Sequence, residues 1–138
     1  NSYCRKPETE RVVLSCKSSR CFNLGIPDNK FVRRKYGYFL DTERFLGNEL
    51  RKYREYIKLP DGDYSAIKPE HLYTLPGGNY AVCTIPIKNE KADFSPLIHW
   101  LKEKHYRTDA VFAEKVGFQL FKYIYHYYCE IKIHLVSQ

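Results

Sequence analysis

The chain has 138 residues, of which 43% are hydrophobic and 28% charged, so it is long enough to bury one hydrophobic core. This composition excludes a disordered, collagen-like or low-complexity protein. No apolar run approaches the ~18 residues that a membrane span needs. We therefore expect a single domain over residues 1–138 that does not enter a membrane. Two features are unusual, namely 13 Tyr residues and a net charge of +7.

The five cysteines lack the spacing of a metal site. Cys16 and Cys21 are five residues apart, while Cys83 and Cys129 lie in apolar runs, where a free thiol behaves as a small hydrophobe. The five His residues are scattered, so we expect neither a metal nor another cofactor. Reduced thiols indicate a cytoplasmic protein. The chain begins with Asn1 and contains no Met, which predicts a piece of a longer protein.

The first half of the chain, residues 10–60, is predicted to contain strands and one short helix. The predicted strands span residues 10–16, 36–41 and 51–59. Asp28 is a candidate N-cap for the helix, and Gly47 with Asn48 predicts a turn. Residues 60–63 consist almost wholly of turn-forming residues, so we place the boundary between two halves there.

The second half, residues 64–136, is predicted to follow the same order of strand, helix, strand and strand. The predicted strands span residues 80–85, 111–120 and 127–136, after a turn at 76–79. Ser95 followed by Pro96 is typical of a helix start. The apolar spacing of Phe94, Leu97, Ile98 and Leu101 predicts one buried helix face. These patterns favour an α+β fold with a structural repeat.

The last two predicted strands contain the most informative residue. From Tyr127 to Leu135 the odd positions are apolar and the even ones, such as Tyr128, are polar, which predicts one buried face. In the preceding strand, Glu114 shares a face with the apolar Phe112. A buried carboxylate must be neutral, paired, or in contact with a cationic ligand. Either a salt bridge to Lys or Arg or a site for an organic cation bound by aromatic faces fits this pattern.

Three segments are informative when taken together. They are residues 73–82, which contain Pro-Gly-Gly-Asn-Tyr-Ala, the helix end at 100–106, and the final strand at 127–133. These segments resemble GyrI-like effector-binding domains, and most closely the C-terminal drug-binding domain of MerR-family multidrug-sensing transcription activators. The resemblance is good over residues 70–136 and weaker over 10–60. It implies two strand-helix-strand-strand repeats that form an antiparallel sheet with helices, and a ligand cleft between the repeats.

The resemblance also implies a function and a set of site residues. Glu114 matches a buried carboxylate that binds lipophilic or aromatic cations, while Tyr53, Tyr127 and Tyr36 match tyrosines of the pocket. Trp100 lies beside the apolar helix face and belongs either to the core or to this pocket. The partners would be hydrophobic cationic small molecules, and DNA through a separate helix-turn-helix domain that is absent from this chain. The full-length protein would be a homodimer, and the domain would not be an enzyme.

Two other functions are open from the sequence. Residues 30–36 and 51–54 interleave cations with aromatic side chains, as nucleic-acid-binding surfaces do, so the alternative is a nucleic-acid or protein-binding inhibitor module using its basic face. A third class is a hydrolase on the same scaffold with Glu114 as general base. Glu55 is a second candidate carboxylate, although its neighbours Arg54 and Lys58 favour an ion pair.

Overall fold

The computed structural model describes residues 4–16, 36–59, 62–116 and 126–136, which form an eight-stranded sheet, two α-helices and a 3-10 turn. The strands are β1 (Cys4–Glu8), β2 (Arg11–Cys16), β3 (Tyr36–Leu40), β4 (Lys52–Lys58), β5 (Leu72–Leu75), β6 (Gly78–Lys88), β7 (Arg107–Lys115) and β8 (His126–Val136). The helices are α1 (Thr42–Leu46) and α2 (Ser95–Glu103), and the 3-10 turn η2 spans Pro69–His71. Neighbouring strands are antiparallel, so the fold agrees with the expected α+β class.

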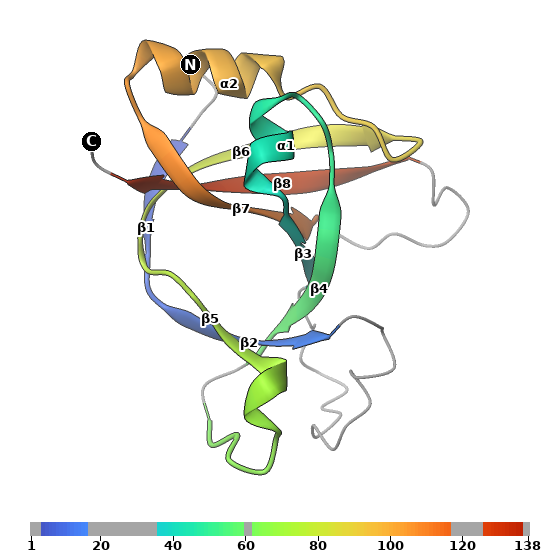
Figure 1. Ribbon diagram of the computed structural model, residues 1–138, viewed down its shortest axis with the longest axis vertical. Helices are drawn as coiled ribbons and strands as arrows, with labels where there is room; N and C mark the ends of the chain where they lie inside the picture. The colour runs from blue at the N-terminus through green and yellow to red at the C-terminus, as the bar shows by residue number, and fades with distance from the viewer. Residues whose placement is uncertain (1–3, 17–35, 60–61, 117–125, 137–138) are drawn as a thin grey trace.

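The sheet closes on itself as a barrel (Figure 1). Its strand order is β1-β6-β8-β7-β3-β4-β2-β5, and its ends meet because β1 runs on into β2 while β5 runs on into β6. The register of this pairing is the same on both sides of the two breaks, as the pairs Glu8↔Gly78 and Arg11↔Leu75 show. Closure creates an interior that side chains must fill.

The barrel wall is buried on both of its faces over much of its surface. The interior cluster consists of Val13, Phe39, Tyr56, Leu75, Tyr80, Val82 and Phe112. On the outside, α1 and α2 cover one side of the barrel (Figure 1), where Phe45, Leu97 and Trp100 pack against the strands. A smaller outer cluster joins Leu14 and Ile57 to side chains of the segment after β4. An apolar strand residue can therefore face either the interior or the helices.

Most of the predicted strands are confirmed. Those predicted over residues 10–16, 36–41, 51–59, 80–85 and 127–136 correspond to β2, β3, β4, β6 and β8. The one predicted over 111–120 corresponds to β7, which begins earlier, at Arg107. The helix predicted from Asp28 and residues 60–61 of the predicted boundary lie outside the described residues.

Four short elements, β1, α1, η2 and β5, are not predicted by the sequence pattern. β1 contains adjacent charged residues and a Pro, without the alternation of a half-buried strand. α1 has only five residues, and the Asp41 carboxylate accepts a hydrogen bond from the Arg44 backbone nitrogen at 3.1 Å. α2 begins at Ser95 as predicted, but Ser95 is not the cap. Instead, the Asp93 carboxylate accepts hydrogen bonds from the Ser95 backbone nitrogen at 3.0 Å and from its hydroxyl at 2.6 Å.

One glycine fixes the geometry of the barrel interior. Gly37 on β3 pairs with Tyr56 on β4 and with Glu114 on β7. A β-carbon added to Gly37 would lie 2.2 Å from Cζ of the Tyr56 ring. The ring therefore lies across the space that a side chain at residue 37 would occupy. This close approach lets the Tyr56 hydroxyl reach Glu114.

Candidate functional site

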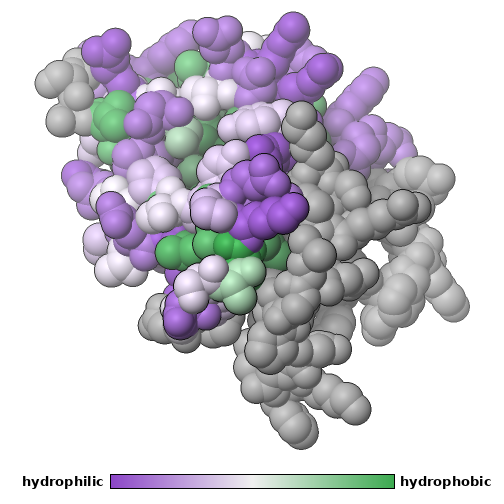
Figure 2. All heavy atoms as spheres, turned by 60° about the horizontal axis from the view of Figure 1, so that its bottom comes forward, coloured by the Kyte–Doolittle hydropathy of each residue, from purple (hydrophilic) through white to green (hydrophobic). Residues whose placement is uncertain are grey.

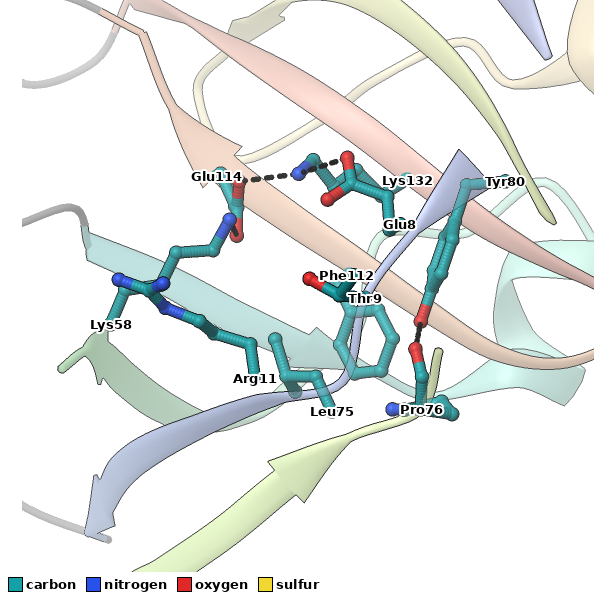
Figure 3. A pocket seen from close by; sticks show the side chains of 10 residues that line it. All are labelled: Glu8, Thr9, Arg11, Lys58, Leu75, Pro76, Tyr80, Phe112, Glu114 and Lys132. Atoms are coloured by element: carbon teal, nitrogen blue, oxygen red, sulfur yellow. Dashed lines mark hydrogen bonds and ion pairs between the residues drawn. The ribbon is translucent and has the colours of Figure 1, made fainter. Parts of the chain in front are cut away.

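The barrel interior contains a cavity with about 280 Å³ of empty space, part of which is open to solvent (Figure 3). Its wall consists of Glu8, Thr9, Arg11, Lys58, Leu75, Pro76, Tyr80, Phe112, Glu114 and Lys132. It lies beside the breaks in the two long strands, because Thr9 follows β1 and Pro76 follows β5.

Glu114 is the centre of a buried ion cluster on the cavity wall, and its side chain is 0% exposed. Lys58 Nζ lies 3.0 Å from its Oε2, and Lys132 Nζ lies 3.2 Å from its Oε1. Tyr56 donates its hydroxyl to Oε2 at 2.6 Å. Lys132 Nζ also lies 3.0 Å from Glu8 Oε1, as Figure 3 shows. Of the two possibilities left open by the sequence, the structure thus shows an ion pair at Glu114.

The two lysines of this cluster are not equivalent. Burial lowers the pKa of Lys58, and the charge of Lys132 adds to this effect, while Glu114 opposes it. Burial also acts to lower the pKa of Lys132, but Glu114 and Glu8 outweigh it and raise this pKa above its ordinary value. The Lys58 side chain is 19% exposed and that of Lys132 is 9% exposed. Lys58 is therefore the counter-ion of Glu114 that is more easily moved.

Tyr56 completes the cluster as a neutral hydrogen-bond donor. Burial and the adjacent Glu114 carboxylate raise the pKa of Tyr56 well above its ordinary value, so its hydroxyl keeps the proton that it donates. Among the described residues, the carboxylate therefore has one neutral hydrogen-bond donor and two ammonium groups in ion-pair contact. Such pairing is what makes a fully buried charge tolerable.

Tyr127 lies on the other face of the sheet from Glu114. The alternation of apolar and polar residues along the last strand predicts that Tyr127 is buried. Its side chain is indeed only 5% exposed, whereas Tyr128 is 57% exposed. Tyr127 packs in the outer cluster beneath the helices, while Glu114 lines the interior cavity. The structure therefore does not bring these two predicted site residues together.

Tyr127 does contact a cation, but this cation belongs to the protein. Lys52 Nζ lies 4.1 Å from the centre of the Tyr38 ring and 5.0 Å from that of Tyr127, and it forms a short hydrogen bond with the Tyr127 hydroxyl. Glu90 supplies the counter-charge, with Oε2 at 2.9 Å from Lys52 Nζ and Oε1 accepting the Tyr127 hydroxyl at 2.8 Å. Lys115 Nζ lies 5.3 Å from the Tyr127 ring centre. We call Lys52, Tyr38, Tyr127 and Glu90 the lysine cage.

The lysine cage should contribute to stability. Replacing Lys52 by Met is expected to lower the free energy of unfolding by about 1–2 kcal/mol, because cation–π contacts and charged hydrogen bonds are lost. Urea denaturation measures this change. Lys102→Met, at an exposed lysine of α2, is the control and should stay within about 0.5 kcal/mol of the wild type. Equal effects of the two substitutions would contradict a stabilising cage.

The other predicted site residues do not line the cavity. Tyr53 is 59% exposed, and its ring lies 5.8 Å from that of Phe39, while Tyr36 is 45% exposed. Trp100 lies on the buried face of α2 and stacks on Tyr106 with ring centres 5.4 Å apart, so it takes the core position, the first of its two possible roles. Of the five predicted residues, Glu114 alone belongs to the cavity wall.

Sequence reasoning misses the cations that face Glu114. The alternation of β8 predicts that Lys132 and His134 face solvent, but they are only 7% and 9% exposed. The reason is closure of the barrel, which buries the polar face of β8 as well as its apolar face. A signal exists in the sequence, because pairing the last two strands sets Lys132 opposite Phe112, on the face that carries Glu114.

His134 connects three parts of the wall near the cavity. Its Nδ1 lies 2.6 Å from Asp109 Oδ1 on β7, and its Nε2 lies 3.1 Å from the Gly77 carbonyl oxygen between β5 and β6. The Tyr80 hydroxyl donates to the Pro76 carbonyl at 2.5 Å in the same region. These contacts hold the break between β5 and β6, and thus one border of the cavity, in place.

The basic segments of the sequence are only partly described. Within residues 51–54, Lys52 lies in the lysine cage, and Arg54 donates to the Ser15 hydroxyl at 3.0 Å and to the Tyr73 hydroxyl at 2.6 Å. Residues 30–35 lie outside the described part. Where the face in Figure 2 is described it is mainly hydrophilic, and apolar residues show only in small patches. Among the described residues, the interior cavity is a candidate site for ligand binding.

The described residues include two cysteines whose surroundings are known. Cys129 is buried and Cys83 half-buried, both as free thiols, and burial raises the pKa of Cys129 to about 11. Over the described ranges, no cluster of three or more His, Cys, Asp or Glu could hold a metal ion. Nor does any helix in these ranges have the length and apolar character needed to cross a membrane.

Comparisons with known proteins give no assignment. No protein-family model matches the chain, and no curated protein matches it. The features of the described residues that bear on function are the cavity and the charges on its wall.

Proposed function

We propose that this chain is a GyrI-like effector-binding domain that senses a lipophilic or aromatic cation for a transcription regulator. The observation that carries the proposal is Glu114, a fully buried carboxylate on the wall of a cavity that also presents apolar surface. Phe112 and Tyr80 supply aromatic faces in this wall, and such faces bind organic cations through their ring quadrupoles. The ligand would lie against these rings with its charge toward Glu114.

The strand order supports the two repeats of the proposal. Exchanging β1 and β2 with β5 and β6, β3 with β7, and β4 with β8 reproduces the same ring of neighbouring strands. The cavity wall takes residues from both halves, for example Lys58 from the first and Lys132 from the second. The cavity is therefore our candidate for the ligand cleft between the repeats.

Lys58 acts as an internal substitute for the ligand. Its ammonium occupies the position at Glu114 Oε2 that a ligand cation would take, and its partial exposure lets it move aside. Displacement moves a residue near the end of β4, so ligand binding favours one arrangement of that strand. A ligand shifts such an equilibrium only by its difference in affinity for the two states. That shift would pass to a DNA-binding domain elsewhere in a homodimeric regulator.

Titration with N-methylacridinium, a fluorescent aromatic cation whose charge does not depend on pH, tests this function. Wild-type protein should bind it saturably, and Glu114→Gln should weaken binding about tenfold or more, since a charged contact contributes about 1.5–3 kcal/mol. Lys58→Met should strengthen binding, because the competing ammonium is removed. This second variant retains Glu114 and so tests the site even if Glu114→Gln folds poorly.

The pH dependence of the same titration has a defined sign. Because burial lowers the pKa of Lys58, its ammonium is lost at lower pH than that of an ordinary lysine. Wild-type affinity should therefore rise as the solution becomes alkaline, and Lys58→Met should remove this rise. Absence of binding by the wild type and by Lys58→Met, together with salt-dependent retention of DNA or RNA, would instead support the nucleic-acid alternative.

A further inference from the structure

Arg11 is the charged residue of the cavity wall whose role the ion cluster leaves unexplained. Its Nε is buried without a hydrogen-bond partner, and within the described ranges its guanidinium forms no ion pair. Arg11 lies two residues before Val13, which pairs with Lys58, so Arg11 and Lys58 are diagonal neighbours on one face of the wall. A buried donor without an acceptor is costly, and an anionic group in the cavity would supply the acceptor.

The charges of the wall lead to the same conclusion. Glu8, Lys132, Glu114 and Lys58 alternate in sign and contact one another in that order, so they are balanced. Arg11 adds one positive charge to this wall. Glu130 also lies 3.8 Å from Lys132, but it is partly exposed and does not line the cavity. The empty cavity therefore has one more cation than carboxylate on its wall.

A ligand that carried only a cation would increase this imbalance. It would displace Lys58 from Glu114 and leave the Lys58 ammonium beside Arg11 without a carboxylate. Burying an unpaired charge is strongly unfavourable. A ligand that carried both a cation and an acidic group would leave the surplus at one positive charge and would give every cation a carboxylate, since its cation would take Glu114 while its acidic group would contact both Lys58 and Arg11.

We infer that the ligand is amphoteric: an aromatic molecule with a cationic group for Glu114 and a carboxylate or similar acidic group for Arg11 and Lys58. This inference rests on the proposed function, in which Glu114 binds the cation. The remaining wall, with Leu75, Pro76 and Phe112, is apolar and suits a flat ring system.

Three indole compounds with different charges test the cationic group and the acidic group of the ligand separately. Tryptophan is a zwitterion, tryptophan methyl ester carries only the cation, and indole-3-propionate carries only the anion. Isothermal titration at pH 6, where the amino group of the ester is protonated, should show tryptophan binding about tenfold more tightly than the ester. Arg11→Gln should abolish this preference by weakening tryptophan binding alone. The matched control is Arg107→Gln, at an exposed arginine of β7 away from the cavity wall, which should change neither affinity.

The outcomes distinguish this inference from the proposed function. If the ester binds as tightly as tryptophan in the wild type, the acidic half is wrong, while cation sensing by Glu114 stands. If indole-3-propionate binds as tightly as tryptophan and Glu114→Gln has no effect, the cationic half is wrong, and the proposed function fails with it. Failure of all three compounds to bind at millimolar concentration would overturn the ligand class. Hydrolysis of the ester during the titration would show an enzyme and contradict a purely binding role.

Discussion

Replacing Gly37 by Ala is expected to destabilise the barrel by about 3 kcal/mol or more. The added methyl group would lie 2.2 Å from the Tyr56 ring, so the ring must move and take its hydroxyl away from Glu114. Overpacking a core costs about 1–3 kcal/mol, and losing the Tyr56 hydrogen bond to the buried carboxylate adds about 1.5–3 kcal/mol. Equilibrium denaturation in urea measures the loss.

Gly62→Ala is the matched control for this substitution. A β-carbon there would lie 3.5 Å from the Tyr64 hydroxyl oxygen, which is ordinary van der Waals contact, and Gly62 is exposed. We expect a change within about 0.5 kcal/mol. A cost of Gly37→Ala no larger than that of Gly62→Ala would show that Tyr56 does not need the space above residue 37.

A double-mutant cycle isolates the steric cause. Tyr56→Leu removes the ring atoms that approach residue 37, so Gly37→Ala should cost less in this background than in the wild type. A coupling energy of about 1 kcal/mol or more is expected for residues in such close contact. Additive costs would place the effect of Gly37→Ala in the strand backbone and not in the Tyr56 ring.

Removing the charge of Glu114 is expected to have the second large effect. Glu114→Gln leaves the Lys58 and Lys132 ammonium groups without the carboxylate that joins them, although Lys132 keeps Glu8. Breaking a buried pair by removing one partner typically costs about 3–5 kcal/mol. Thermal and urea unfolding, measured against the exposed control Glu103→Gln on α2, give the size of the loss.

The origin of that loss can be tested by removing the orphaned charge as well. Adding Lys58→Met to Glu114→Gln should restore a large part of the stability, because replacing both partners of a buried pair by uncharged groups is far less costly than replacing one. If the double variant is less stable than Glu114→Gln alone, then Lys58 contributes mainly through packing of its aliphatic stem. In that case its ammonium is not the counter-ion we describe.

The sequence predicts the strands well because alternation and turn residues are local signals. It also identifies Glu114, since a carboxylate on an apolar face departs from the pattern wherever that face is buried. It cannot show which buried face a residue occupies. Tyr127 and Glu114 both lie inside the protein, but one faces the helices and the other the barrel interior.

The missed residues have a related cause. Alternation assumes that one face of each strand is wet, which is common for antiparallel sheets, and under this assumption Lys132 is a solvent-exposed lysine. Closure of the sheet makes the polar face an interior face, so Lys132 becomes a partner of Glu114. Closure depends on the pairing of β1 and β2 with β5 and β6, residues more than sixty positions apart, as Arg11 and Leu75 show. No local pattern contains that information.

The two strand breaks give the barrel a seam. Regular pairing ends at Glu8↔Gly78 and resumes at Arg11↔Leu75, so the intervening residues of both strands lie opposite each other at one level of the wall. Because fewer hydrogen bonds join the strands at this level, the wall bends more easily here than at the paired residues on either side. Those pairs keep their register. A ligand that widened the cavity would therefore bend the barrel wall at the seam. It would change the angle between the parts of the wall on either side of the seam, while the register of the strands stayed the same.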